Sequence, residues 1–188
     1  MRFGIYNLII RLYAKRAMNK VLVAIGVALI LIAIVYFAYD YLSSGQVNVY
    51  IQDPGGNQAA SNSSYVRIYL TITSIMLHKE NATGNPWVTI SNGTETVLLS
   101  GSPTFLASAK IPTGTYNEVR LVVSSAKVEI GGVNVSAALP SSVLKIPIVG
   151  SLKLSGGSNV NLIIELPGVH YADGEIIINP TAVAYVQS

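Results

Sequence analysis

The chain has no cysteine among its 188 residues. This absence excludes disulfide bonds, thiolate metal sites and cysteine catalysis, so that packing and hydrogen bonds alone must stabilise any exported domain. Histidine is nearly as scarce, because only His78 and His170 are present. A hydrolase needs a nucleophile, a base and an orienting group, and the sequence shows no such triad. We therefore expect no catalytic residues and no enzymatic activity.

Charged residues are also few, at 11% of the chain, and their basic excess lies at one end. Residues 1–42 carry five basic residues against Asp40, a net charge of +4. Residues 43–188 carry seven basic and eight acidic residues, a net charge of −1. Nucleic-acid-binding domains need a dense basic surface. The sequence therefore predicts that nucleic acid is not a partner.

The remaining polar motifs are weak signals of chemistry. Asp173-Gly174-Glu175 comes nearest to a calcium loop, but an Asp-Gly pair is more often a turn. Ser-x-x-Lys spacing occurs twice, at Ser124 to Lys127 and at Ser142 to Lys145, in strand-like sequence where residues i and i+3 point to opposite faces. We therefore expect no metal, no cofactor and no serine catalysis.

What the chain does have is one uncharged apolar run of 19 residues, Val21 to Tyr39. As a helix this run rises about 28 Å at roughly 1.5 Å per residue, close to the roughly 30 Å hydrocarbon core of a bilayer. Basic residues precede the run, and positive charge stays on the cytoplasmic side. The sequence therefore predicts a single-pass plasma-membrane protein that contacts lipid through residues 21–42. We expect a basic cytoplasmic N-terminus over residues 1–20, a transmembrane signal-anchor helix over 21–42, a linker over 43–45 and an extracytoplasmic domain over 46–188.

Two alternatives for the N-terminal region stay open at this point. Ser43 and Gly45 occupy the −3 and −1 positions for cleavage before Gln46, which would release a secreted form. Met18 is an alternative start that would shorten the cytoplasmic segment.

Beyond Ser43 the apolar residues alternate with polar ones, which is typical of half-buried strands. Val47, Val49 and Ile51 form the first alternation. Further strands are expected over residues 66–72, 87–90, 96–99, 105–111, 116–130, 133–137, 144–148, 152–154, 160–166 and 175–186. This pattern predicts an all-β domain, a single immunoglobulin-like or transthyretin-like β-sandwich, with a barrel as the alternative.

Two local backbone features follow from the same pattern. Gly131-Gly132 lies between two strands and predicts a two-residue hairpin with positive φ at both positions. The alternation that ends at Val123 resumes one residue out of phase at Ala126. This shift predicts a β-bulge near Ser124-Ser125.

Aromatic and asparagine residues give the candidate binding and modification sites. Core packing is the favoured interpretation of Trp87 and four tyrosines, and a carbohydrate-stacking platform is the alternative. The tyrosines in question are Tyr65, Tyr69, Tyr171 and Tyr185. The four candidate N-glycosylation sites are Asn62, Asn81, Asn92 and Asn134, each in a sequon.

The order of several segments resembles the domain of unknown function 4382 family over residues 46–186. These segments are GQVNVYIQDPGG, VRIYLTITSIMLHKE, PWVTI, LASAKIPTGTYNEVRLVVSSAKVEIGG, LKIPI and INPTAVAYV. The resemblance implies an exported, membrane-tethered β-sandwich of prokaryotic envelopes with no assigned activity. Lys15-Arg16-Ala17 before the apolar run is also similar to archaeal type IV pilin precursors.

These observations favour a membrane-anchored cell-surface protein of an archaeal envelope, with a structural or adhesive role and no catalysis. Its expected partners are membrane lipid, other envelope proteins or further copies of itself. One alternative is a filament subunit, either pilin-like or completing a neighbour's sheet with residues 46–53. The other alternative is a carbohydrate-binding or sensory module.

Overall fold

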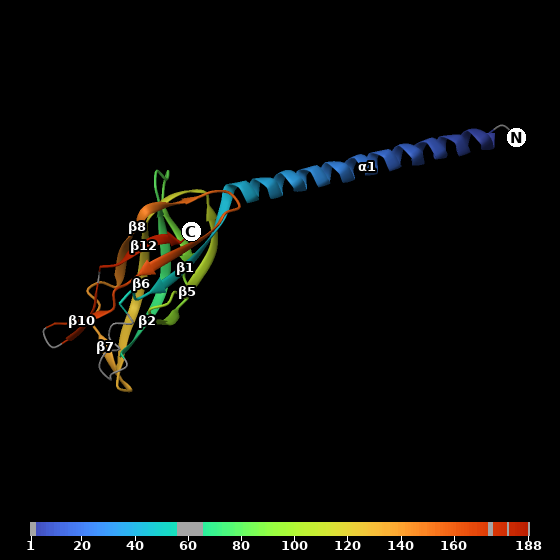
Figure 1. Cartoon of the computed structure of the whole chain (residues 1–188). Helices are drawn as coiled ribbons and strands as arrows, with labels where there is room; N and C mark the ends of the chain where they lie inside the picture. Colours follow the sequence, from blue (N-terminus) through green and yellow to red (C-terminus); the bar gives the residue numbers. More distant parts are fainter. Residues whose placement is uncertain (1–2, 56–65, 173–174, 180, 188) are drawn as a thin grey trace. The chain divides into compact units, whose positions relative to one another are not determined.

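The computed structural model describes residues 3–55, 66–172, 175–179 and 181–187. The chain divides into two compact units, Met1–Tyr41 and Leu42–Ser188. The helix α1 (Phe3–Ser43) makes up the first unit and is drawn in blue in Figure 1. Within it, the stretch Lys20–Ser43 is long and apolar enough to cross a membrane, and none of it is buried in the protein.

The second unit consists of strands. They are β1 (Ser44–Gln52), β2 (Val66–Lys79), β3 (Trp87–Ser91), β4 (Glu95–Leu99), β5 (Thr104–Pro112), β6 (Gly114–Ile130), β7 (Val133–Ala137), β8 (Val143–Leu154), β9 (Asn159–Glu165), β10 (Val169–Ala172), β11 (Glu175–Ile178) and β12 (Val183–Gln187). Ten of them form one sheet in the order β3-β2-β6-β8-β12-β9-β1-β5, with β4 paired to β2 and β7 paired to β6. Strands β10 and β11 form a separate antiparallel hairpin.

Two long antiparallel strands, β2 and β6, form the centre of one half of the sheet. Along the edge that faces away from β6, β2 pairs with β4 over its first part and with β3 over its last part. The free side of β6 is covered in the same way by β8 and β7. Each long strand therefore holds two shorter strands end to end.

The other half of the sheet is centred on β1, which is antiparallel to β5 and parallel to β9. The inward side chains of β1, Val47, Val49 and Ile51, are fully buried. Strand β12 follows on the far side of β9. Because β1 pairs along both of its edges, the first strand of the domain is one of its best-embedded strands.

One parallel pair, Ala184 with Ile148, joins the two halves through β12 and β8. At the opposite end of the sheet, β3 and β4 contact β5, so that the sheet nearly closes around one hydrophobic core. The all-β prediction is confirmed. The architecture combines features of both alternatives. Two halves pack around one core as in a sandwich, and they remain parts of a single sheet as in a barrel.

The local backbone predictions are also confirmed. Gly131 and Gly132 have φ values of 58° and 85° and connect β6 to β7. Thr71 pairs with Ser125 and Ile72 with Val123, which leaves Ser124 as the extra residue of a bulge. The strand predicted at 66–72 extends to Lys79, and the boundaries differ in three further places. The strands predicted at 144–148 and 152–154 are one strand, the strand predicted at 175–186 is two, and β10 was not predicted.

The segment predicted as a linker, residues 43–45, belongs instead to the end of α1 and the start of β1. Two backbone amides from neighbouring turns pair with its carbonyls, Thr113 with Ser43 and Gly157 with Ser44, each at 2.9 Å. These hydrogen bonds give residues 43 and 44 regular partners, which a free linker would lack.

Candidate functional site

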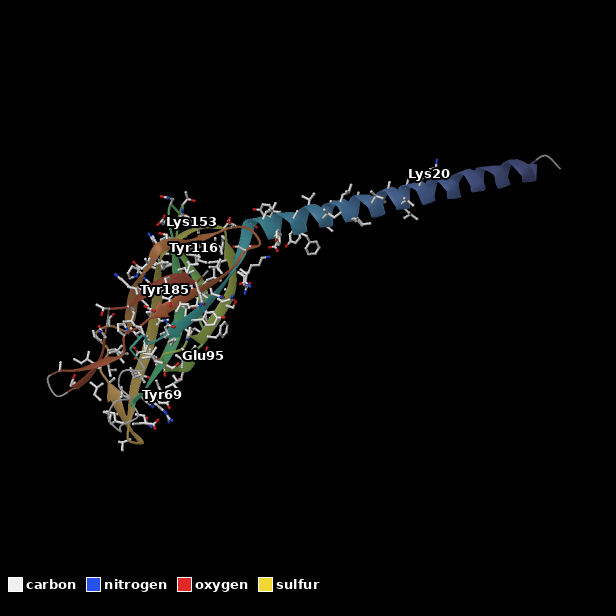
Figure 2. The ribbon with its side chains drawn as sticks, in the orientation of Figure 1. Lys20, Tyr69, Glu95, Tyr116, Lys153 and Tyr185 are labelled. Atoms are coloured by element: carbon white, nitrogen blue, oxygen red, sulfur yellow. The ribbon has the colours of Figure 1, made fainter. Side chains whose placement is uncertain are left out.

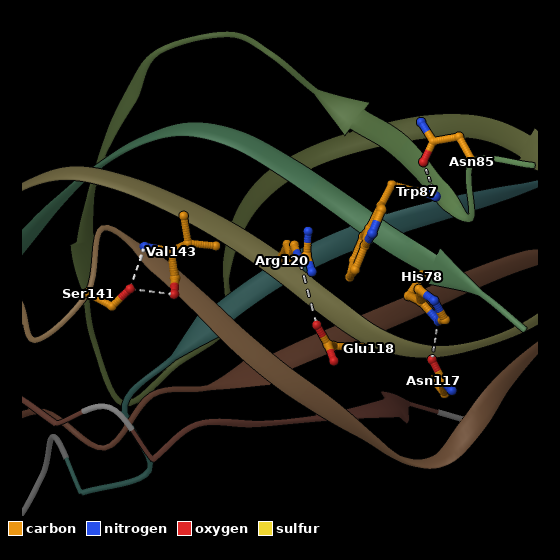
Figure 3. Close-up of polar contacts among 8 residues, drawn as sticks. All are labelled: His78, Asn85, Trp87, Asn117, Glu118, Arg120, Ser141 and Val143. Carbon is orange, nitrogen blue, oxygen red and sulfur yellow. Dashed lines mark hydrogen bonds and ion pairs between the residues drawn. The ribbon is translucent and has the colours of Figure 1, made fainter.

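Trp87, the single tryptophan of the chain, lies on the outer face of the sheet formed by β3, β2 and β6. It pairs in register with His78, which in turn pairs with Glu118. Arg120 follows two residues later on β6, and its side chain therefore points to the same face. Figure 3 shows the ring of Trp87 with Arg120 on one side and His78 on the other.

The contacts around Trp87 are close. The guanidinium carbon of Arg120 lies 3.6 Å from the ring centroid, which is a cation–π contact. The ring centroid of His78 lies 4.9 Å from that of Trp87. Nδ1 of His78 donates a hydrogen bond of 2.8 Å to Oδ1 of Asn117. The ring of Trp87 is therefore already engaged by protein side chains.

Glu118 balances the charge of Arg120 imperfectly. Its Oε1 lies 3.7 Å from Nε of Arg120, too far for a hydrogen bond. Both atoms are buried without a hydrogen-bond partner. The guanidinium group of Arg120 therefore combines stacking on Trp87 with a long ion pair to Glu118.

The predicted platform of Trp87 and tyrosines is not assembled by the described residues. The hydroxyl of Tyr69 donates to Glu129 at 3.2 Å, at the opposite end of β2 from Trp87. Tyr185 belongs to β12, in the other half of the sheet, and Figure 2 labels it well apart from Tyr69. Tyr65 and the side chain of Tyr171 lie outside the described residues. Strand pairing, which the sequence does not reveal, separates these rings.

A second outer surface, which the sequence reasoning missed, crosses β5, β1 and β9. We call it the amide face and define it by five side chains that point outward in register: Gln46, Asn48, Ser108, Asn159 and Asn161. Its members are half-buried or exposed. The sequence showed these residues only as the polar positions of separate strands.

Hydrogen bonds within the amide face fix its side chains. Nδ2 of Asn48 donates to Oδ1 of Asn159 at 2.8 Å and to Oδ1 of Asn161 at 2.9 Å. The hydroxyl of Ser108 donates to Oδ1 of Asn48 at 2.6 Å, and Nε2 of Gln46 donates to that hydroxyl. Asn48 is therefore the centre of a ladder that spans three strands.

An aromatic row borders the amide face. Phe105 of β5 is 49% exposed and meets Tyr50 of β1 edge to face, with 5.6 Å between ring centroids. Tyr50 pairs with Ile163, which pairs with Tyr185. Ile163 is 1% exposed although it lies outside the main core cluster. Its burial on the outer side of the sheet places it between the two tyrosines.

Gln52 connects Tyr185, at the end of the aromatic row, to the carboxylate of Glu165. Its Nε2 donates to Oε1 of Glu165 at 2.8 Å and to the hydroxyl of Tyr185 at 3.1 Å. Burial and the negative charge of Glu165 raise the pKa of Tyr185 above its usual value. Tyr185 is therefore a neutral hydroxyl at physiological pH.

The other candidate residues take separate places in the fold. The hydroxyl of Ser124 donates to the carbonyl of Thr71 at 3.2 Å. Ser142 precedes β8, where its carbonyl pairs with Val123, and Lys145 lies opposite Arg120. Among the described residues, no group of three or more His, Asp or Glu could hold a metal ion. Asp173 lies outside them.

Three of the four sequon asparagines are exposed: Asn81, Asn92 and Asn134. Asn81 has a φ of 53° in the turn after β2, and Asn134 lies on the exposed strand β7. Oδ1 of Asn92 accepts a hydrogen bond of 2.9 Å from Ser74. Asn62 lies outside the described residues. Glycosylation at these sites stays a prediction.

Comparison with known families gives one match. The model of a family described as Domain of unknown function (DUF4382) matches residues 44–180. Comparison with curated proteins finds no match. Comparison with solved structures also finds none.

Proposed function

The chain belongs to the DUF4382 family, and we propose that it is a membrane-anchored cell-surface protein whose β-domain makes adhesive contacts in the envelope. One observation carries this proposal. The apolar helix α1 ends at Ser43, and β1, the middle strand of the amide face, begins at Ser44. The proposed transmembrane helix would therefore be followed directly by the middle strand of an exposed polar surface that is available for contacts.

The proposed topology rests on charge and length. The stretch Lys20–Ser43 has 24 residues, which rise about 36 Å as a helix and are enough to cross the roughly 30 Å apolar core. The basic excess before it favours a cytoplasmic N-terminus and an extracytoplasmic β-domain. Residues 21–42 would contact lipid of the plasma membrane.

We further propose that the β-domain acts by binding, without catalysis, cofactor or nucleic acid. The dispersed positions of Ser124, Ser142 and the carboxylates support this view. The strand-donating form of the filament alternative is less favoured, because β1 already pairs on both edges within its own chain, whereas the pilin-like form stays an alternative. Strand addition to a neighbour would break both ladders and expose three fully buried side chains.

Topology can be tested with single cysteines, since the chain has none of its own. Ser136→Cys places a thiol on the exposed strand β7, and Ala17→Cys places one before the apolar run. In intact cells, a membrane-impermeant maleimide should label the Ser136→Cys variant only. Labelling of Ala17→Cys alone would overturn the proposed orientation.

Adhesion can be tested with proteoliposomes that carry the full chain. They should bind isolated envelopes, and Asn48→Lys should abolish binding because it removes the centre of the ladder and adds a charge. Thr89→Lys, on the exposed outer side of β3, is the matched control and should bind normally. Equal loss with both variants would show that charge alone, and not the amide face, controls adhesion.

A further inference from the structure

The amide face carries almost no charge. Lys110 lies at its margin, opposite Gln46, and Glu165 at the far end accepts a hydrogen bond from Gln52. Between these two residues the described side chains of the surface are amides, hydroxyls, aromatic rings and the buried Ile163, and none of them is charged. A strongly charged ligand would find no opposite charge there, because Coulomb attraction needs one close by.

The hydrogen-bonding groups of the face are held in place before any ligand arrives. Asn48 uses both hydrogens of its Nδ2 on Asn159 and Asn161. The Nδ2 groups of these two residues have no partner among the described residues. They remain available as donors with fixed positions. Binding then costs little additional side-chain entropy, because the rotamers are already restricted.

The aromatic row adds apolar surface beside these donors. Phe105 is 49% exposed and is supported from the side by Tyr50. An aromatic ring next to fixed amides suits a ligand with an apolar C–H face and a rim of hydroxyl groups. Sugar rings have this combination.

We propose that the amide face binds an uncharged polysaccharide, with Phe105 stacking on a sugar ring and Asn159 and Asn161 donating to its hydroxyls. This inference rests on the adhesive function proposed above and names the class of its ligand. A protein partner fits less well, because the centre of a protein interface is apolar. Here the amide face itself is polar, and Phe105, at 49% exposed, is the most exposed apolar residue of the aromatic row among the described residues.

The site differs from the platform expected from the sequence. Trp87 is held between Arg120 and His78, so its ring already has protein contacts where a sugar would stack. Of the two expected tyrosines whose side chains the structure describes, Tyr69 and Tyr185, the second belongs to the aromatic row. We therefore place the carbohydrate-binding site on the other half of the sheet, on β5, β1 and β9.

The test uses the full chain in lipid nanodiscs and a panel of neutral and acidic polysaccharides. Binding should be confined to neutral members of the panel. Phe105→Ala should weaken it about tenfold, as expected for the loss of one aromatic contact. Asn161→Ala should also weaken it, since it removes one donor. Val149→Ala, which truncates a 65% exposed side chain on β8, is the matched control and should not change binding.

Three positive results, and the absence of any binding to neutral polysaccharides, would overturn the inference. The first is binding confined to acidic polysaccharides, and the second is equal weakening by Val149→Ala. The third is a dimer that Phe105→Ala dissociates in analytical ultracentrifugation, because a second copy would then occupy the face. If proteoliposomes adhere to envelopes but no neutral polysaccharide binds, the ligand class is wrong and the adhesive function stands. If neither binds, both proposals fail.

Discussion

Removing the hydroxyl oxygen of Tyr116 tests how much one hydrogen bond contributes to the stability of the β-domain. Its side chain is fully buried, and its hydroxyl donates a hydrogen bond of 2.7 Å to the carbonyl of Pro112, four residues earlier. Gly114 lies between them with a φ of 150°, and a Cβ there would lie 2.6 Å from Cε of Lys79. The hydrogen bond of Tyr116 thus closes a tight turn between β5 and β6.

Tyr116→Phe should lower the free energy of unfolding by about 1 kcal/mol, the usual net worth of one hydrogen bond. The cost stays modest because Pro112 is exposed and water can reach its carbonyl. Tyr116→Ala should cost about 3–5 kcal/mol, because it leaves a cavity of ring size in the core. Comparing the two losses in the free energy of unfolding distinguishes the contribution of the hydroxyl from that of the ring.

The pH dependence provides an independent check. Burial raises the pKa of Tyr116 above the ordinary tyrosine value of 10.0. The folded state therefore favours the neutral phenol, and its contribution to stability is complete below about pH 10 and is lost as the pH rises further. The Tyr116→Phe variant should therefore lose less stability at alkaline pH than the unchanged protein. Tyr185, whose pKa is also raised, should account for part of the stability that this variant still loses.

Urea unfolding of residues 42–188, followed by Trp87 fluorescence, measures these quantities. This segment is suitable because every residue of the core cluster lies within it. The reasoning is refuted if Tyr116→Phe destabilises the domain as much as Tyr116→Ala does, or if its alkaline loss equals that of the unchanged protein.

Three further predictions use the same assay or the same fluorophore. Deleting Ser124 removes the extra residue of the bulge and leaves Val123 and Ala126 on the same face, so it should cost only about 1 kcal/mol; deleting Lys127, which no bulge compensates, should cost about 3 kcal/mol or more because Val128 would turn outward. Gly132→Ala should cost about 1–2 kcal/mol through its φ of 85°, whereas Gly93→Ala, with no positive φ, should cost little. Arg120→Ala uncovers Trp87 and should increase quenching of its fluorescence by iodide, and an unchanged quenching constant would contradict the stacking in Figure 3.

The sequence was informative wherever a feature depends on neighbours along the chain. Alternating apolar residues predicted most strands, and the phase shift after Val123 predicted the bulge at Ser124. Gly131-Gly132 predicted its turn because few other residues adopt positive φ at two successive positions. β10 was missed because its four residues, Val169–Ala172, show no clear alternation of apolar and polar side chains.

The candidate site was beyond such reasoning because it depends on strand register. Asn48 and Asn161 are 113 positions apart, and only the parallel pairing of β1 with β9 brings them together. The same limitation affected Trp87, whose partners His78 and Arg120 come from two other strands. Polar residues on an alternating strand are indistinguishable in sequence from an ordinary solvated face.

In the topology proposed above, the junction between α1 and β1 would set the order of cleavage and folding. The bond that a signal peptidase would cut, between Gly45 and Gln46, lies inside a paired strand. Gly45 is buried, and the amide of Gln46 donates to the carbonyl of Ser158 at 2.8 Å. A protease can reach this bond only before β1 joins its sheet. Release and retention would therefore depend on whether cleavage or folding is faster, and a molecule that folded first would retain the apolar helix.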